Sequence, residues 1–249
     1  MKTIGISDFK ALVNECLENP SLFAGKTVVL WKARPGKDSM AYRVIKHCCI
    51  EYNRKNVTDQ AWFSYSDMTF RTDEIADLRV FCDQQDMYGY KEHGILLNTG
   101  CFYPADQFDA WLKFINTHEN DRGRLSDRWV LIACAQEGSY VLEESLFGGN
   151  CDIYSLQPSL DEWSGWVARY NSQAVMGPVL AYIKEKRSDV SLDVWQIVLD
   201  ELDGALFHNK VESLKQISEH DYDMAVRGSL GLSYPDFPYK ELWDFIQSF

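Results

Sequence analysis

Short runs of consecutive apolar residues constrain the fold of this 249-residue chain more than any other feature. Residues 129–135 read Trp-Val-Leu-Ile-Ala-Cys-Ala and hold no charged side chain, and Thr27–Trp31 and Gly94–Leu97 are nearly as apolar. A strand with one face in water alternates apolar and polar residues, and these runs do not alternate. They predict strands that are buried on both faces, as in a parallel sheet covered by helices.

Helical patterns follow the predicted strands in turn, which is the order of a parallel α/β sheet. Further strands are predicted over 61–65 and 152–156, and helices over 8–17, 39–52, 72–84 and after Pro104. From about Ser159 only helical patterns remain, over 160–170, 174–186, 190–206 and 239–249. The predicted fold is therefore an α/β core over 1–158 with helices on both faces of the sheet, followed by an all-helical domain over 159–249.

The charge balance excludes some classes of function. The chain has 25 Lys and Arg against 37 Asp and Glu, a net charge of −12, and half of this excess lies in residues 184–249. A general binder of nucleic acid clusters basic residues instead. No apolar stretch reaches the roughly 18 residues that a membrane span needs, and the first residues lack the apolar run of a signal peptide. We predict a cytoplasmic protein with no membrane or nucleic-acid partner.

Seven cysteines are present, with no Cys-x-x-Cys spacing, and several lie in apolar runs. This pattern predicts buried free thiols in a reducing compartment. The sharper alternative is a metal site, in which His47, Cys48 and Cys49 would join Cys82, His93 or Cys101. Neighbouring residues of a helix point about 100° apart and seldom share one metal ion, so we predict no metal site.

The tripeptide Gly25-Lys26-Thr27 looks like the end of a phosphate-binding loop, but its context is wrong. The motif needs a glycine where this chain has Pro20, and a phosphate loop must follow a strand and open a helix. The tripeptide precedes the predicted strand. The required order of strand, loop and helix occurs one step later, at residues 31–40.

Around that loop the sequence resembles a known family. Residues 27–45, TVVLWKARPGKDSMAYRVI, resemble the first strand–loop–helix unit of AAA+ ATPases, particularly the MoxR-like branch. Later stretches resemble, in order, the Walker B strand, the sensor 1 strand, the entry to the lid domain and three segments of the lid. These stretches are GILLNTGCFYPADQFDAWLKFI, RWVLIACAQEG, SLQPSLDEWSGWVARY, SLDVWQIVLDEL, AVRGSLG and ELWDFIQSF. The resemblance spans residues 26–249 and implies an AAA+-like core, a helical lid, ATP and Mg²⁺.

The residues that carry the family's chemistry are replaced. Aligned on Pro35-Gly36, the phosphate-binding lysine becomes Ser39 and the Mg²⁺-binding Ser/Thr becomes Met40, with Asp38 in place of a glycine. The two Walker B carboxylates become Asn98 and Thr99. The sensor 1 position holds Gln136, the sensor 2 arginine becomes Asp193, and the arginine-finger region 146–151 has no arginine.

Phosphoryl transfer depends on positioned positive charge and Mg²⁺, so these replacements predict a pseudo-ATPase without a cofactor. The remains of its nucleotide loop would be Arg34, Pro35, Gly36, Lys37 and Ser39. We expect an adaptor, scaffold or regulatory subunit that acts through protein–protein contacts. The resemblance implies an active AAA+ subunit or a von Willebrand A domain protein as partner.

Two other functions fit the sequence. A divergent NTPase could use Lys37 or Arg34 from shifted positions, and an acidic inhibitor or nucleic-acid mimic could bind a basic partner through the helical domain.

The remaining polar and aromatic clusters are expected to have structural rather than functional roles. We expect Asp73, Glu74 and Asp77 on a solvated helix face, His220, Asp221 and Asp223 in a polar loop, Arg122, Arg124 and Arg128 in a solvated loop, and Trp163, Trp166, Trp195 and Trp243 in the core between helices.

Overall fold

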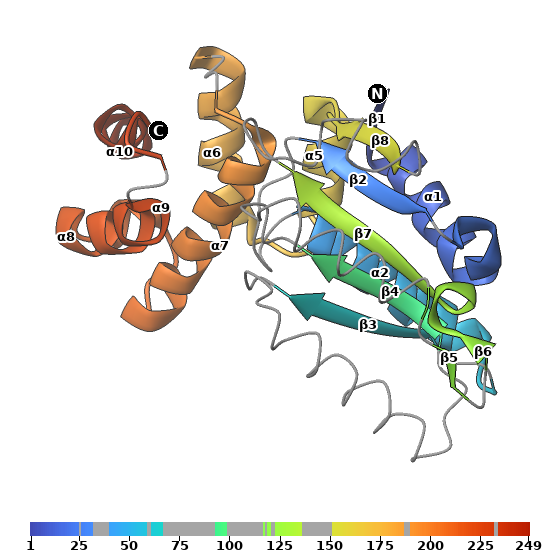
Figure 1. Cartoon of the computed structure of the whole chain (residues 1–249). Coiled ribbons are helices and arrows are strands. Elements are labelled where there is room, and N and C mark those ends of the chain that lie inside the picture. The colour runs from blue at the N-terminus through green and yellow to red at the C-terminus, as the bar shows by residue number, and fades with distance from the viewer. Residues whose placement is uncertain are drawn as a thin grey trace. The chain divides into compact units, whose positions relative to one another are not determined.

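The computed structural model describes residues 1–24, 26–31, 40–58, 61–66, 93–98, 117, 119–120, 123–135, 151–186, 190–231 and 234–249. By its internal contacts the chain forms two compact units, Met1–Gln157 and Pro158–Phe249. The first contains the sheet and the second is helical (Figure 1). The predicted helices over 72–84 and after Pro104 lie outside the described residues.

The first unit is built on a six-stranded sheet in which every described pair of strands is parallel. In spatial order the strands run β1-β8-β2-β7-β4-β3 (Figure 1). Their bounds are β1 Lys2–Ile4, β2 Thr27–Trp31, β3 Ala61–Ser66, β4 His93–Asn98, β7 Trp129–Ala135 and β8 Cys151–Leu156. The predicted α/β class with a parallel sheet is confirmed.

The apolar runs form the middle of this sheet. Strand β2 lies between β7 and β8, and β7 lies between β2 and β4, so each has a neighbour on both sides. Residues 28–30 of β2 and 129–134 of β7 are buried, as expected for strands covered on both faces. Strand β1 was not predicted, because three residues with only Ile4 buried carry no readable pattern.

Two helices cover one face of the sheet. Helix α1 (Ile6–Glu18) packs against α2 (Met40–Lys55), and both contact β4 (Figure 1). The α2 side chain of Asn53 fixes the start of β3, since it donates to the Ala61 carbonyl at 2.9 Å and accepts from the Ala61 amide at 2.7 Å. Helix α1 begins at Ile6, directly after Gly5.

A few short elements complete this unit. Turns of 3₁₀ helix, η1 (Pro20–Phe23) and η2 (Leu125–Asp127), contact each other. Strands β5 (Glu119–Asn120) and β6 (Gly123–Arg124) form a small antiparallel pair. Arg124 is exposed and Arg128 half-buried, while Arg122 lies outside the described residues.

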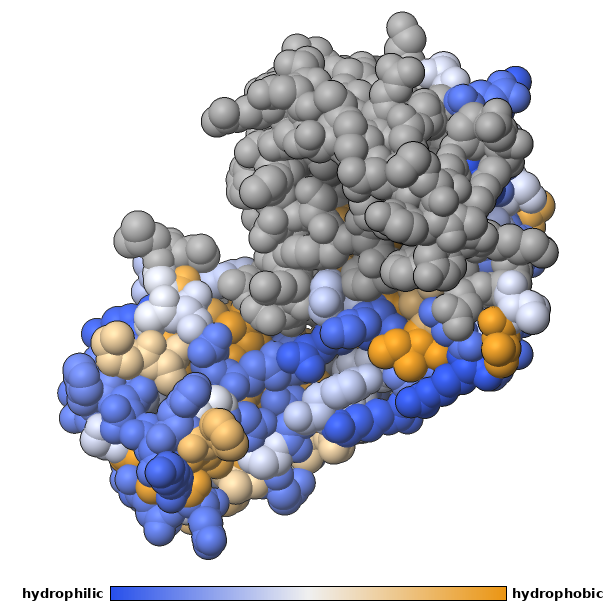
Figure 2. All heavy atoms as spheres, turned by 90° about the horizontal axis from the view of Figure 1, so that it is seen from below, coloured by the Kyte–Doolittle hydropathy of each residue, from blue (hydrophilic) through white to orange (hydrophobic). Residues whose placement is uncertain are grey.

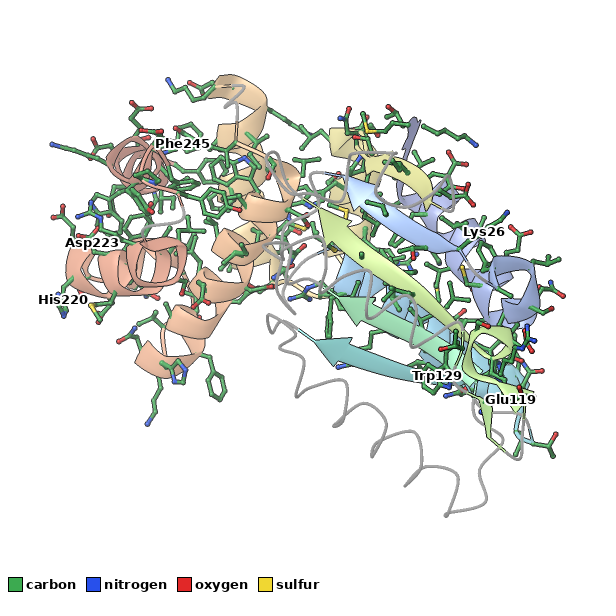
Figure 3. The ribbon with its side chains drawn as sticks, in the orientation of Figure 1. Lys26, Glu119, Trp129, His220, Asp223 and Phe245 are labelled. Carbon is green, nitrogen blue, oxygen red and sulfur yellow. The ribbon has the colours of Figure 1, made fainter. Side chains whose placement is uncertain are left out.

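The second unit consists of helices, as predicted. They are α5 (Leu160–Val167), α6 (Gln173–Lys186), α7 (Leu192–Asn209), η4 (Leu214–Gln216), α8 (Glu219–Tyr222), the π-helical segment η5 (Asp223–Arg227), α9 (Gly228–Leu230) and α10 (Tyr239–Ser248). One prediction was wrong. His220 and Asp221 lie in α8 and Asp223 opens η5, so these residues are helical rather than in a loop (Figure 3).

Aromatic rings fill the core of the helical unit. The indole of Trp195 is fully buried and meets the rings of Tyr182 at 5.8 Å and Phe237 at 5.1 Å between centroids. Trp163 and Trp166 are also buried, as the sequence predicts. Trp243 is half-buried and packs on Tyr222, with ring centroids 4.9 Å apart.

A buried polar network joins the loop between α5 and α6 to α7. The Asn171 amide donates to Asp200 at 2.8 Å and to Asp203 at 3.0 Å, and Gln196 donates to Asn171 at 3.1 Å and to Asp200 at 3.0 Å. Asp203 also accepts from the backbone amide and hydroxyl of Ser172. Every amide hydrogen in this network meets a carboxylate or carbonyl oxygen, which offsets the cost of burying these groups.

None of the described helices has the length and apolarity that crossing a bilayer requires.

Candidate functional site

Three strands end side by side at the carboxyl edge of the sheet. Trp31 at the end of β2 pairs with Ala135 at the end of β7. Asn98 at the end of β4 pairs with Ala133, two residues before the end of β7. Because the strands are parallel, the chain segments that follow them all start at this edge. The next described element after β2 is helix α2, which begins at Met40.

The chain reverses its direction across the sheet at this place. From β2 it passes β7 and β4 to reach β3, returns through β4 and β7, and then passes β2 to reach β8. The connections after β2 and after β7 therefore leave neighbouring strands in opposite directions. In open α/β sheets such a switch point, at the carboxyl ends of the strands, is where ligands bind.

The predicted site residues fall partly in the described structure. The loop residues Arg34, Pro35, Gly36, Lys37 and Ser39, together with Thr99 and Gln136, lie outside the described residues. Asn98 is the last residue of β4, and Met40 is the first residue of α2. Asp193 belongs to the helical unit, as the second residue of α7.

Comparison with solved structures shows which known folds this chain resembles. The structure of the Aeropyrum pernix ORC2 protein, with ADPNP and ADP, matches 89% of this chain at 10% sequence identity with a TM-score of 0.51. The match covers 66% of that chain, just under two thirds of its length. Cdc6p from Pyrobaculum aerophilum matches 98% of this chain and 79% of its own at 12% identity and a TM-score of 0.42. A RuvB mutant from Thermotoga maritima matches 90% and 69%, at 12% identity and a TM-score of 0.41.

The chain has an AAA+-like fold.

Sequence comparison adds no family to this result. No protein-family model matches the chain, and no curated protein matches it either. At 10% identity the likeness to the Aeropyrum pernix protein concerns the fold alone. What this chain does must therefore be argued from its own residues.

The side chain of Met40 determines much of what the start of α2 could bind. In the AAA+-like arrangement the helix after the first core strand opens with a lysine for phosphate and a hydroxyl for Mg²⁺. Here Met40 opens that helix, and its side chain is only 3% exposed. A buried thioether fills apolar space, and Mg²⁺ takes oxygen ligands instead.

The described part of this edge does not fit a magnesium nucleotide. In the sequence resemblance Asn98, the last residue of β4, takes the place of the carboxylate that would hold Mg²⁺, and Met40 supplies neither a charge nor an oxygen ligand. Positioned charge is what holds a magnesium nucleotide, and neither Met nor Asn carries a charge. We therefore derive no step that uses ATP or Mg²⁺ here.

Asp193 has a different role in this structure. It is 8% exposed and lies in the first turn of α7, where the N-cap Ser191 accepts from the Val194 amide. The amino end of a helix carries partial positive charge, which favours a carboxylate and disfavours an arginine. Asp193 thus suits the start of α7 in a way that the sensor arginine would not.

Lys26 lies at the other edge of the sheet. It precedes β2, and Thr27 is fully buried within that strand. Figure 3 shows Lys26 and Trp129, which begins β7, both away from the arrowheads of the strands. This position agrees with the reading of Gly25-Lys26-Thr27 as no phosphate site, and it makes Lys26 a useful control below.

The cysteines behave as buried thiols where the structure describes them. Cys16, Cys48, Cys49 and Cys134 are free and buried. Burial raises the pKa of the Cys48 thiol to about 11 and that of Cys49 to about 12, so both are protonated and poor metal ligands at neutral pH. Among the described residues no cluster of His, Cys, Asp or Glu could hold a metal ion.

One hollow was not foreseen from the sequence. It has a volume of about 80 Å³ and lies between the outer sides of α1 and α2, lined by Lys10, Glu18, His47, Glu51 and Lys55 among others. The lining mixes both signs of charge at helical spacing, which is typical of solvated helix faces. It offers no convergent set of groups for a reaction.

Proposed function

We propose that this protein is a catalytically inactive AAA+-like protein of the MoxR-like type that acts as an adaptor, scaffold or regulatory subunit. The observation that carries the proposal is the buried Met40 at the start of α2, beside a strand β4 that ends in Asn98. Phosphoryl transfer relies on positioned cations and a metal, and these residues supply neither. The replacements at Ser39, Thr99 and Asp193 agree in direction.

The partner classes follow from the resemblance of the sequence. We propose that an active AAA+ subunit or a von Willebrand A domain protein binds this chain, since MoxR-like proteins work with such partners. We place the protein in the cytoplasm, because its buried free thiols suit a reducing compartment.

The test is nucleotide binding and turnover by the full chain. We expect no change in the unfolding temperature and no phosphate release with millimolar ATP and Mg²⁺. Turnover that is lost in Lys37→Ala and kept in Lys26→Ala would contradict the proposal and favour a divergent NTPase. Lys26 is the matched control because it lies at the opposite edge of the sheet from the nucleotide loop.

A second measurement tests the adaptor role. Affinity capture of the tagged protein from its native cytoplasm, read by mass spectrometry, should recover an AAA+ subunit or a von Willebrand A domain protein. Mixing the purified pair should then change the ATPase rate or the assembly state of the partner. A purified pair that forms no complex would contradict the partner assignment.

A further inference from the structure

We draw no further inference here: the strongest candidate, the surface patch on α7 around the exposed Phe207 and the unpacked Gly204, carries nothing, because on the face of the molecule in Figure 2 the described hydrophobic residues lie in small separate groups and nothing in the structure shows what covers this patch.

Discussion

The two units of this molecule hold their cores together in different ways. In the α/β unit, aliphatic side chains and thiols fill the space around strands β2 and β7, and the register of the parallel ladder places each of them. In the helical unit the centre is aromatic, around Trp195, and a network of amides and carboxylates ties α7 to the loop before α6. A repeated apolar pattern specifies the first kind of core, whereas individual rings and hydrogen bonds specify the second.

The largest effect should come from the aromatic centre. Trp195→Ala removes a fully buried ring that Tyr182 and Phe237 flank, and we expect a loss of about 4 kcal/mol in the free energy of unfolding. Trp195→Phe should cost clearly less, because within the described residues the buried indole N–H has no hydrogen-bond partner to lose. Urea denaturation followed by circular dichroism measures both, and equal losses would contradict this account.

Each unit also depends on one asparagine side chain, and the two should differ. Asn171→Ala removes the donor that bridges Asp200 and Asp203 and leaves buried Gln196 with one partner fewer, so we expect a loss of about 2–3 kcal/mol. Asn53→Ala removes two hydrogen bonds to Ala61 at the partly buried start of β3, and should cost about 1–2 kcal/mol. The same denaturation experiment compares them, and a larger loss for Asn53→Ala would reverse the comparison.

Alkaline pH should weaken the two units in sequence. Burial raises the pKa of Cys49 from 9.0 to about 12, and burial beside Glu241 raises the pKa of Tyr182 from 10.0 to about 12. A raised pKa in the folded state means that the stability is complete below the ordinary pKa and is lost as the pH rises toward the folded value. The α/β unit should therefore begin to lose stability above pH 9 and the helical unit above pH 10.

Two variants separate these contributions. In urea denaturation across this pH range, Cys49→Ala should make the fall above pH 9 shallower, while Tyr182→Phe should change only the fall above pH 10. A fall in stability that neither variant alters would contradict the assignment of the titrating groups.

The smallest predicted effect is a gain in the free energy of unfolding. Lys210 ends α7 in the left-handed conformation, with φ of +54°, which costs a side-chain-bearing residue about 1 kcal/mol. Lys210→Gly should therefore raise the free energy of unfolding by up to about 1 kcal/mol, read from the urea midpoint. An unchanged midpoint would mean that the lysine side chain compensates for its backbone.

The strands of the α/β unit could be predicted from the sequence because an uninterrupted apolar run has few other uses. The ends of five strands were predicted to within one residue, whereas β1 was not predicted because it is too short to show a pattern. In the helical unit the long helices were predicted, but the helical stretch from Glu219 to Leu230 was not, since its polar residues resemble a loop. The network around Asn171 was also missed, because its partners lie 25 to 32 residues away along the chain.

The sequence predicted where the candidate site lies, but not the burial and helix positions of its residues. The sequence predicted a nucleotide loop after the strand over 27–31, and the sheet order shows that this strand lies at a switch point. The burial of Met40 and the place of Asp193 in the first turn of α7 became visible only in the structure, because residue spacing reveals neither. The exposure of Phe207, at 81%, could not be found from the sequence, because the predicted helix ends at residue 206 and its pattern does not assign this side chain to either face.

The place of β2 in the sheet has a consequence for how the chain matures during synthesis. Strand β2 is among the first to leave the ribosome, yet its two neighbours, β7 and β8, are made about a hundred residues later. The central strand must therefore wait, apolar and without its first native neighbour, until residue 135 has emerged, and for its second until residue 156, whereas the helical unit closes contacts between segments made in quick succession. The newborn chain is thus most exposed to aggregation before its second unit exists, and slower translation near residue 150 would lengthen that period.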